Sequence, residues 1–356
     1  MSLSLTAEAV KQFAFDRGAD LVGIASMDRF EGAPAQMDPR NIWPDARSAI
    51  VIGRRIPRGV YRGIEEGTHW PNYTFYGYNR LNVLFRPIVT YETACFIEDH
   101  GWEALPVYPG VPEAEPSHQQ LRPDLPAPNV VPHIRLAAVA AGLGEIGWSK
   151  VFLSPQFGPR QRLGMILTDA ELEPDPLFDG QICDRCMACV EACPGAIPHQ
   201  REGKVVRITL AGRTLEWADV DMGICTATHH GMNKEVSPFL ARDFPGLRLN
   251  LREQGLTEEE AYKLTYTLAR ATWRRTDEFP SGSVIDFYRM ALGATGYFAI
   301  CGARGCIRAC MDHLEKTGRI GNLFHEPFRR RPRWSLPYDA SPAGSGLSDD
   351  THADPI

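Results

Sequence analysis

The residues of this chain best suited to chemistry are its cysteines, and eight of the nine fall into two groups. The first group has the spacing C-x2-C-x2-C-x3-C-P and is formed by Cys183, Cys186, Cys189, Cys193 and Pro194. In bacterial proteins with two iron–sulfur clusters, three thiolates of this run bind one 4Fe–4S cluster and the fourth binds the other. The run therefore predicts two clusters and a protein that moves electrons.

The second group has to supply the remaining cluster ligands. It consists of Cys301, Cys306 and Cys310, together with Cys225, which lies upstream of these three. Four residues separate Cys301 from Cys306, where the first group has two. The crossed ligand pattern predicts one cluster on Cys183, Cys186, Cys189 and Cys310 and a second cluster on Cys193, Cys225, Cys301 and Cys306.

Two other uses of cysteine fit this spacing less well. A zinc site favours two C-x2-C or Cys/His pairs and does not need the C-x3-C-P ending. Disulfides form in oxidising compartments, and the N-terminal residues lack the charged and apolar regions of an export signal. The ninth cysteine, Cys95, lies in an apolar stretch and is expected to be a small buried hydrophobic residue.

Length and composition limit the class of protein. A chain of 356 residues is longer than a simple ferredoxin and indicates two domains or a large insertion. A net charge of −6 and an isoelectric point near 6.0 argue against nucleic acid as the main partner. No apolar run approaches the roughly 20 residues of a membrane span, so no membrane partner is expected. We therefore expect a cytoplasmic protein.

The first half of the chain alternates helical and strand-like segments. This alternation predicts an α/β domain over residues 1–172. The expected helices cover residues 6–17, 84–100 and 136–141. The expected strands cover residues 21–25, 48–53, 104–108 and 163–168.

The second half carries the cysteines and is predicted to form a separate cluster module over residues 173–335. A mostly helical insertion of about residues 226–300 interrupts it. The clearest helix of that insertion follows a capping-box pattern at Thr257 and Glu260. The tail, residues 336–356, is rich in Ser, Pro, Gly, Ala and Asp and is expected to be disordered.

Four segments occur in an order that resembles a known family. They are Ala-Ala-Gly-Leu-Gly-Glu-Ile-Gly at 140–147, Leu-Ser-Pro-Gln-Phe-Gly-Pro-Arg at 153–160, the strand at 163–169 and the cysteine run. This order resembles the corrinoid iron–sulfur reductases, which comprise the reductive dehalogenases and the epoxyqueuosine reductases, and is closer to the dehalogenases. Members of this family also carry an isolated cluster ligand between the two cysteine groups, as Cys225 is here.

The resemblance implies an α+β fold. A nitroreductase-like α/β domain would bind a base-off corrinoid (cobalamin), and a bacterial ferredoxin-like module with two 4Fe–4S clusters and a helical insertion would follow it. Electrons would pass through the clusters to cobalt for the reductive cleavage, by dehalogenation, of a small organic substrate. The implied partners are that substrate and a low-potential donor such as ferredoxin or flavodoxin. Homodimers are common among such proteins.

The resemblance also implies a tyrosine that donates a proton beside a basic residue. Tyr76 and Tyr78, in the aromatic stretch 71–79, are the candidates for this tyrosine, and Arg122 and Arg135 are the candidates for its basic neighbour. A positive neighbour eases loss of the phenolic proton. The alternative is that the aromatic stretch is a loop that packs on the core.

Five residues are candidates for contact with the corrinoid. Glycines allow the backbone to approach a flat ring closely, and polar side chains can bind its amide or phosphate groups. The alternative is that these residues pack a loop against the cluster module. The five residues are Gly142, Gly144, Ser154, Phe157 and Arg160.

Two further functions stay open on the sequence. The irregular second cysteine group, with Met311 where the family usually has proline, favours an electron-transfer or activating protein without corrinoid. An epoxyqueuosine reductase acting in tRNA modification would have a carboxylate shortly before the 140–147 segment. Residues 128–132 hold no acid, Asp124 falls too early, and Glu145 stands where that branch tends to have an aromatic residue.

Overall fold

The computed structural model describes residues 4–110, 119–197, 204–233, 236–237, 257, 259–261, 263, 299–332 and 334. Its centre is a four-stranded sheet in the order β1-β2-β6-β3, and every neighbouring pair is antiparallel. The strands are β1 (Leu21–Ser26), β2 (Ser48–Arg55), β3 (Ala104–Val107) and β6 (Gln161–Thr168). All four predicted strands are therefore present, within two residues at either end.

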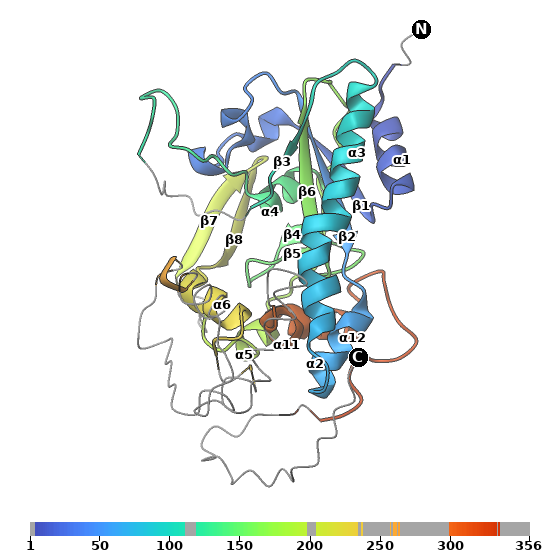
Figure 1. Cartoon of the computed structure of the whole chain (residues 1–356), viewed down its shortest axis with the longest axis vertical. Coiled ribbons are helices and arrows are strands. Elements are labelled where there is room, and N and C mark those ends of the chain that lie inside the picture. Colours follow the sequence, from blue (N-terminus) through green and yellow to red (C-terminus); the bar gives the residue numbers. More distant parts are fainter. Residues whose placement is uncertain are drawn as a thin grey trace, which may run out of the picture.

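Helices cover both faces of this sheet (Figure 1). Helices α1 (Ala7–Asp16) and α3 (Arg86–Glu98) pack on one face, against β-branched side chains such as Ile50 and Ile52. Helix α4 (Ile134–Ala140) packs on the other face, against Val51. Neighbouring residues of β2 point to opposite faces, and both faces are buried, which explains why this strand is apolar throughout its centre.

The predicted helix at 84–100 is part of a longer helical segment. Two π-helical stretches, η5 (Tyr73–Asn79) and η6 (Leu81–Phe85), precede α3 with a single residue between them. The aromatic stretch is therefore helical, and it is not a loop. π-Helical turns are rare and are frequent at functional sites.

The cysteine-bearing part gathers below the sheet in Figure 1. Its helices are α5 (Ala188–Glu191), α6 (Met222–His229), α11 (Cys301–Arg304) and α12 (Cys306–Lys316). Two short hairpins accompany them: β4 (Glu145–Ile146) with β5 (Phe152–Leu153), and β7 (Val205–Leu210) with β8 (Arg213–Ala218). The sequence analysis did not predict the β7–β8 hairpin.

Hydrophobic contacts cross the predicted domain boundary at residue 172. Ile208 and Trp217 of the β7–β8 hairpin pack in the core beneath the sheet with α4. Residues of segment 56–81 pack with Ala299, Ile300 and Met311. The division into two domains stays a prediction. Residues before and after position 172 share the same hydrophobic clusters.

Part of the predicted insertion and all of the predicted disordered tail lie outside the described residues. The capping box is present, because Glu260 accepts a hydrogen bond from the Thr257 amide at 2.8 Å and donates its own amide to Thr257 Oγ1 at 3.2 Å. Among the described ranges, no helix combines the length and the apolar character needed to cross a membrane.

A buried ion pair joins α12 to the short helix α2 (Arg62–Glu66). Arg308 donates two hydrogen bonds to the Glu65 carboxylate, at 2.7 and 2.8 Å, and Arg329 contacts the same group. The Arg308 and Glu65 side chains are only 8% and 10% exposed. Because α12 carries two of the cysteines, this pair fixes their helix to the sheet-forming part of the chain.

We expect Glu65→Ala to lower the free energy of unfolding by about 3 kcal/mol, because it leaves the buried Arg308 guanidinium without its carboxylate. Anaerobic denaturant titration of the folded protein measures this loss. Glu66→Ala is the matched control, since Glu66 is exposed and pairs with Arg331 at 3.4 Å at the surface. An equal effect of both substitutions would contradict the role given to the Glu65 pair.

Candidate functional site

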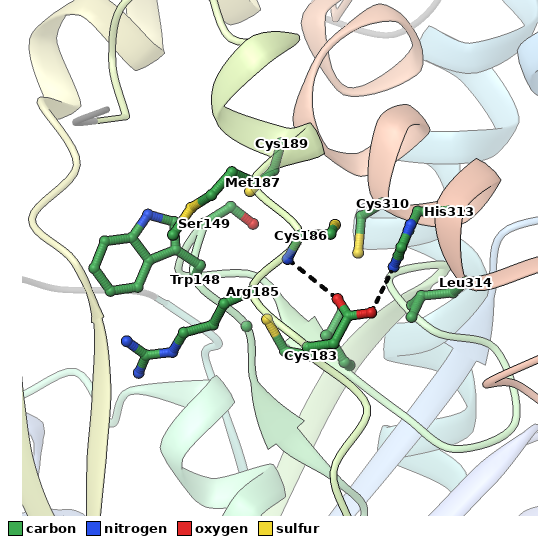
Figure 2. Close-up of a pocket in the computed structure, with 13 residues that line it drawn as sticks. Trp148, Ser149, Cys183, Arg185, Cys186, Met187, Cys189, Cys310, His313 and Leu314 are labelled. Atoms are coloured by element: carbon green, nitrogen blue, oxygen red, sulfur yellow. Dashed lines mark hydrogen bonds and ion pairs between the residues drawn. The ribbon is translucent and has the colours of Figure 1, made fainter. Parts of the chain in front are cut away.

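A small pocket brings together the four cysteines predicted to hold the first cluster (Figure 2). Cys183 and Cys186 lie in the loop before α5, Cys189 lies on α5, and Cys310 lies on α12. Between the first three cysteines the backbone takes positive φ at Arg185 and Met187, 56° and 64°. These two residues reverse the chain, so that thiols close in sequence line one pocket. The remaining lining residues are Gly147, Trp148, Ser149, Leu153, Asp184, Arg185, Met187, His313 and Leu314.

The other four cysteines also converge. Burial raises the pKa of the Cys301 thiol well above its usual value, and neighbouring Cys306, Cys225 and Cys193 raise it further. The pKa of Cys306 is raised by burial and then by Cys193 and Cys225. These four thiols come from the end of α5, from α6, from α11 and from the start of α12.

The wide spacing between Cys301 and Cys306 has a structural explanation. Helix α11 is a single turn, and Gly305 leaves the helical conformation before α12 begins. A Cβ atom on Gly305 would lie 2.8 Å from Cys301 Sγ, so the thiol packs against the glycine backbone. The extra residues form this turn, which lets both thiols join the same set.

The two sets of thiols adjoin one another. The pKa of Cys306 is also raised by Cys189, and the pKa of Cys310, raised mainly by burial, is also raised by Cys306. Cys186, of the first set, is the exposed member of the eight. Each set offers four soft sulfur donors, which is the ligand set of a 4Fe–4S cluster. The residues present therefore fit one cluster in each set, with the first set nearer to solvent.

Two acidic residues that the sequence analysis did not assign hold the first set in place. The Asp184 carboxylate accepts from the Cys186 amide at 3.2 Å and lies 2.8 Å from His313 Nε2, as the dashed lines in Figure 2 mark. This contact ties α12 to the cysteine loop. Glu145 Oε1 accepts from the amides of Ile182, at 2.8 Å, and Cys183. Side-chain atoms of Asp184, Cys186 and His313 lie within 4.8 Å of one another, an arrangement that could also hold a metal ion.

The tyrosines of the π-helical segment differ in their surroundings. Tyr73 is fully buried, and burial raises its pKa to about 12, so it is protonated at neutral pH. Tyr78 is half-buried, and its ring lies 4.7 Å from the ring of His229. Tyr76 is 47% exposed. Of the two predicted catalytic tyrosines, Tyr78 faces the interior and Tyr76 lies at the surface.

Arg162, on β6, is the basic residue at these tyrosines. Its Nε donates to the Gly77 carbonyl at 3.1 Å, and its Nη2 donates to the Tyr73 hydroxyl at 3.3 Å. Its guanidinium also lies over the Tyr78 ring, 4.5 Å from the centroid. The sequence analysis missed Arg162. A charged residue at the start of an apolar strand, one residue beyond the Gly-Pro-Arg-Gln segment, was the available indication.

The two arginines predicted to lie beside the catalytic tyrosine have different surroundings. Arg122 is exposed and pairs with Asp124 at 2.8 Å. Arg135 donates a hydrogen bond to the Lys150 carbonyl. Burial lowers the pKa of Arg135 to about 10, although nearby Cys225 and Tyr78 act to raise it. The catalytic roles of Tyr76, Tyr78 and Arg122 stay predictions.

His229 completes the surroundings of Tyr78. It lies four residues after Cys225 on α6, so the two side chains share one face of the helix. Burial lowers the pKa of His229 well below its usual value, and His230 and Arg162 lower it further. At neutral pH, Tyr78 therefore has a cationic arginine over its ring and a neutral histidine close to it, and this histidine is one helical turn from Cys225 of the second set.

The residues predicted to contact the corrinoid are engaged within the protein. A Cβ atom on Gly142 would lie 2.1 Å from the Pro176 carbonyl oxygen, and one on Gly144 would lie 2.0 Å from the Leu153 carbonyl oxygen. At both positions, the lack of a side chain lets a backbone carbonyl from another segment lie against the glycine. Phe157 is 5% exposed and packs in the interior.

The polar members of this group also have protein partners. Ser154 donates to Gln161 Oε1 at 2.8 Å. Arg160 is 1% exposed, and it donates to the Ile56 carbonyl at 3.0 Å and to Asn322 Oδ1 at 2.7 Å. These hydrogen bonds engage the Ser154 hydroxyl and two of the three guanidinium nitrogens of Arg160 within the protein. Their role in corrinoid binding stays a prediction.

Sequence comparison relates part of the chain to characterised reductases, although no protein-family model matches it. Tetrachloroethene reductive dehalogenase of Desulfitobacterium hafniense is 43% identical over 74 residues, which cover 20% of this chain and 13% of the dehalogenase. Epoxyqueuosine reductase of Pseudomonas aeruginosa is 41% identical over 59 residues, or 17% of this chain and 16% of the reductase. The matches thus span a small part of these relatives.

Among solved structures, this chain is similar to a reductive dehalogenase for which a mechanism of B12-dependent dehalogenation was suggested. The TM-score is 0.44 and the sequence identity is 19%, and the match covers 80% of this chain and 37% of the dehalogenase chain. A second similar structure is an epoxyqueuosine reductase with a tRNA stem loop, with a TM-score of 0.41 and 15% identity. The match covers 88% of this chain and 82% of the reductase chain. The sequence matches confirm the predicted resemblance, because part of this chain is similar to a reductive dehalogenase and to an epoxyqueuosine reductase. The fold of this chain is of mixed helix and strand.

Tyr73 and Gly302 generate a prediction about the second set of cysteines. A Cβ atom on Gly302 would lie 1.9 Å from the Tyr73 hydroxyl oxygen and 2.7 Å from Cζ. We expect Gly302→Ala to cost about 2 kcal/mol of stability by overpacking and to displace the adjacent Cys301. Adding Tyr73→Phe should recover part of the loss, because the nearest atom is removed.

Anaerobic unfolding and iron content measure both effects. Gly59→Ala is the matched control, since nothing lies within 4 Å of a Cβ atom built there. A double variant no better than Gly302→Ala alone would show that the Tyr73 hydroxyl is not what excludes a side chain at position 302.

Proposed function

We propose that this protein is a corrinoid- and iron–sulfur-dependent reductase. Electrons pass through two 4Fe–4S clusters to cobalt and serve the reductive cleavage, by dehalogenation, of a small organic substrate. The observation that carries the proposal is the convergence of eight cysteines into two adjoining sets of four. The sequence match to reductive dehalogenases supports the choice of reaction.

The cluster that would receive electrons would be held by Cys183, Cys186, Cys189 and Cys310. Exposure of Cys186 supports this order, because an external donor can approach only a cluster near the surface. A low-potential carrier such as ferredoxin or flavodoxin is the expected donor. A second cluster would be held by Cys193, Cys225, Cys301 and Cys306 and would supply the electron relay on the side of the tyrosine site.

The net reaction of reductive dehalogenation determines which roles the protein residues must fill. Two electrons and one proton replace a carbon–halogen bond by a carbon–hydrogen bond and release a halide ion. A bound corrinoid supplies a strongly reducing, nucleophilic cobalt centre, which is chemistry that side chains lack. The protein has to supply the proton and keep water away from the site.

Tyr78 is the proton donor in this proposal. Its hydroxyl gives up the proton, and the guanidinium of Arg162 over its ring stabilises the negative charge that remains. Neutral His229, whose ring lies 4.7 Å from the Tyr78 ring, contacts the tyrosine without adding a second positive charge. Arg162 also holds the backbone of the segment through the Gly77 carbonyl, which fixes where Tyr78 can point.

One observation favours a second function, an electron-transfer or activating protein that has two clusters and no corrinoid. The five residues predicted to contact the corrinoid are engaged with other parts of the protein. Cobalt content separates the two functions. The corrinoid reductase should hold about eight irons and one cobalt per chain after anaerobic purification from cells supplied with cobalamin. Eight irons without cobalt would overturn it in favour of the second function.

The two sets of ligands predict separate iron losses. Cys310→Ser should remove the first cluster and Cys301→Ser the second, so each variant should retain about four irons per chain. Cys95→Ser is the matched control, since Cys95 lies on α3 outside both sets and should leave about eight irons. Iron analysis with low-temperature electron paramagnetic resonance of the reduced proteins identifies the missing cluster. Full iron content in Cys310→Ser would contradict the crossed assignment.

Tyr78→Phe should lower kcat for halide release by about 100-fold or more, because it removes the proposed acid. The clusters should still reduce at the same potentials, which excludes a general loss of structure. Tyr76→Phe alters a hydroxyl on the same segment but at the surface, and should leave kcat unchanged. Unchanged turnover in Tyr78→Phe would assign the proton to another group.

A further inference from the structure

The two sets of cysteines have charged neighbours of opposite sign. Beside the first set, Glu145 Oε1 accepts a hydrogen bond from the amide of Cys183. Asp184 also lies there, but His313 and Arg319 approach its carboxylate to 2.8 and 3.5 Å. Within the described ranges, no lysine or arginine makes such a contact with Glu145. Glu145 therefore places an uncompensated negative charge beside Cys183.

The hydrogen bond from the Cys183 amide adds to the effect of this charge. The reduction potential of an iron–sulfur cluster depends on its net charge, on hydrogen bonds to its sulfurs and on its exposure to solvent. Amides that donate to the sulfurs stabilise the reduced cluster, which carries one more negative charge. The Cys183 amide donates to Glu145 instead, and the carboxylate repels the added electron. Both effects lower the potential of a cluster on the first set.

The second set has a guanidinium as its neighbour. Arg135 reaches from α4 to the carbonyl of Lys150, in the loop that also carries Trp148. Trp148 belongs to the hydrophobic cluster against which Cys225 and Cys306 pack. Burial lowers the pKa of Arg135, and Cys225 and Cys306 oppose this change, so its charge acts on both thiols. In the part of the chain that the structure describes, no carboxylate pairs with Arg135.

A guanidinium at this position raises the potential of a cluster on the second set. It attracts the electron that the cluster gains, and the attraction is strong where water is excluded. Arg304, at the end of α11, acts in the same direction, since it lies between Cys301 and Cys306 in the chain. Burial raises the pKa of the Cys301 thiol, and the charge of Arg304 opposes this rise.

Burial alone would order the two clusters the other way. Cys186 exposes the first set to solvent, whereas no cysteine of the second set is exposed. Water stabilises the more highly charged reduced state, so exposure favours an electron on the first cluster and burial disfavours one on the second. Without an opposing influence, electrons would stay near the surface.

We propose that Glu145 and Arg135 set the direction of electron flow, Glu145 by lowering the potential of the first cluster and Arg135 by raising that of the second. Both residues act through their charge, and neither is a cluster ligand. Electron transfer from the first set to the second is then favourable although the second set is buried. The inference rests on the two clusters of the proposed function, and it holds whether or not a corrinoid accepts the electrons.

Redox titration of the anaerobically purified protein, followed by electron paramagnetic resonance, measures both potentials. Cys301→Ser and Cys310→Ser, which should each retain one cluster, assign the two signals. Glu145→Gln keeps an acceptor for the Cys183 amide and removes the charge, so it should raise the potential of the first cluster alone. Arg135→Met should lower the potential of the second cluster alone. Each shift should change the distribution of an electron between the clusters by about tenfold, which is about 59 mV for one electron.

Two controls separate charge from structure. Arg135→Lys keeps a positive charge and should leave the potential of the second cluster close to that of the unaltered protein. Glu8→Gln removes an exposed carboxylate from the first turn of α1, which lies far from α11 and α12 in Figure 1, and should change neither potential. An iron content of about eight per chain checks that both clusters are present.

The outcomes distinguish this inference from the proposed function. A second cluster with the lower potential in the unaltered protein would overturn the inference and leave the proposed function intact. Potentials that do not respond to Glu145→Gln and Arg135→Met, with the iron retained, would do the same. Loss of iron from Glu145→Gln would show that the carboxylate holds the cysteine loop, and would overturn its electrostatic role. An unaltered protein without two clusters would overturn both the inference and the proposed function.

Discussion

The arrangement of this protein depends on one constraint, which is that two sets of four thiols must be assembled next to each other. Two short helices meet it in the same way. Helix α5 and the residue that follows its cap carry Cys189 and Cys193, and α12 carries Cys310 and Cys306. In each case the two cysteines are four residues apart and belong to different sets, and on α12 this spacing places them on one face of the helix.

The sheet part meets the cysteine part through side chains that serve both. Arg162 leaves the central sheet and reaches the π-helical segment, where it contacts Tyr73 and Tyr78. Tyr73 in turn packs on Gly302, next to Cys301. The path from the sheet to the second set of cysteines is thus a row of direct contacts between buried or half-buried groups. A π-helix suits this role because its wider turn presents residues that an α-helix would place on another side.

The amino-acid sequence was sufficient to predict structural features that depend on a local pattern of residues. The four strands were predictable from β-branched runs, and the grouping of the cysteines was predictable from a crossed ligand pattern. The features missed depend on long-range contacts. The position of Arg162 at the start of an apolar strand does not reveal its role, because that role arises from strand β6 lying beside the segment around Gly77. The β7–β8 hairpin was missed for a similar reason, since Trp217 and Ile208 are buried against a distant layer.

The shared helix α12 has a consequence for electron tunnelling. The rate of tunnelling falls steeply with distance, so a redox relay needs a separation that thermal motion does not change. Cys306 and Cys310 sit one turn apart on this helix, about 6 Å along its axis. Arg308, between them, is anchored by Glu65. If each set holds a cluster as proposed, movements of the surrounding chain would displace the two clusters together, and the gap between them, and hence the tunnelling rate, would be preserved.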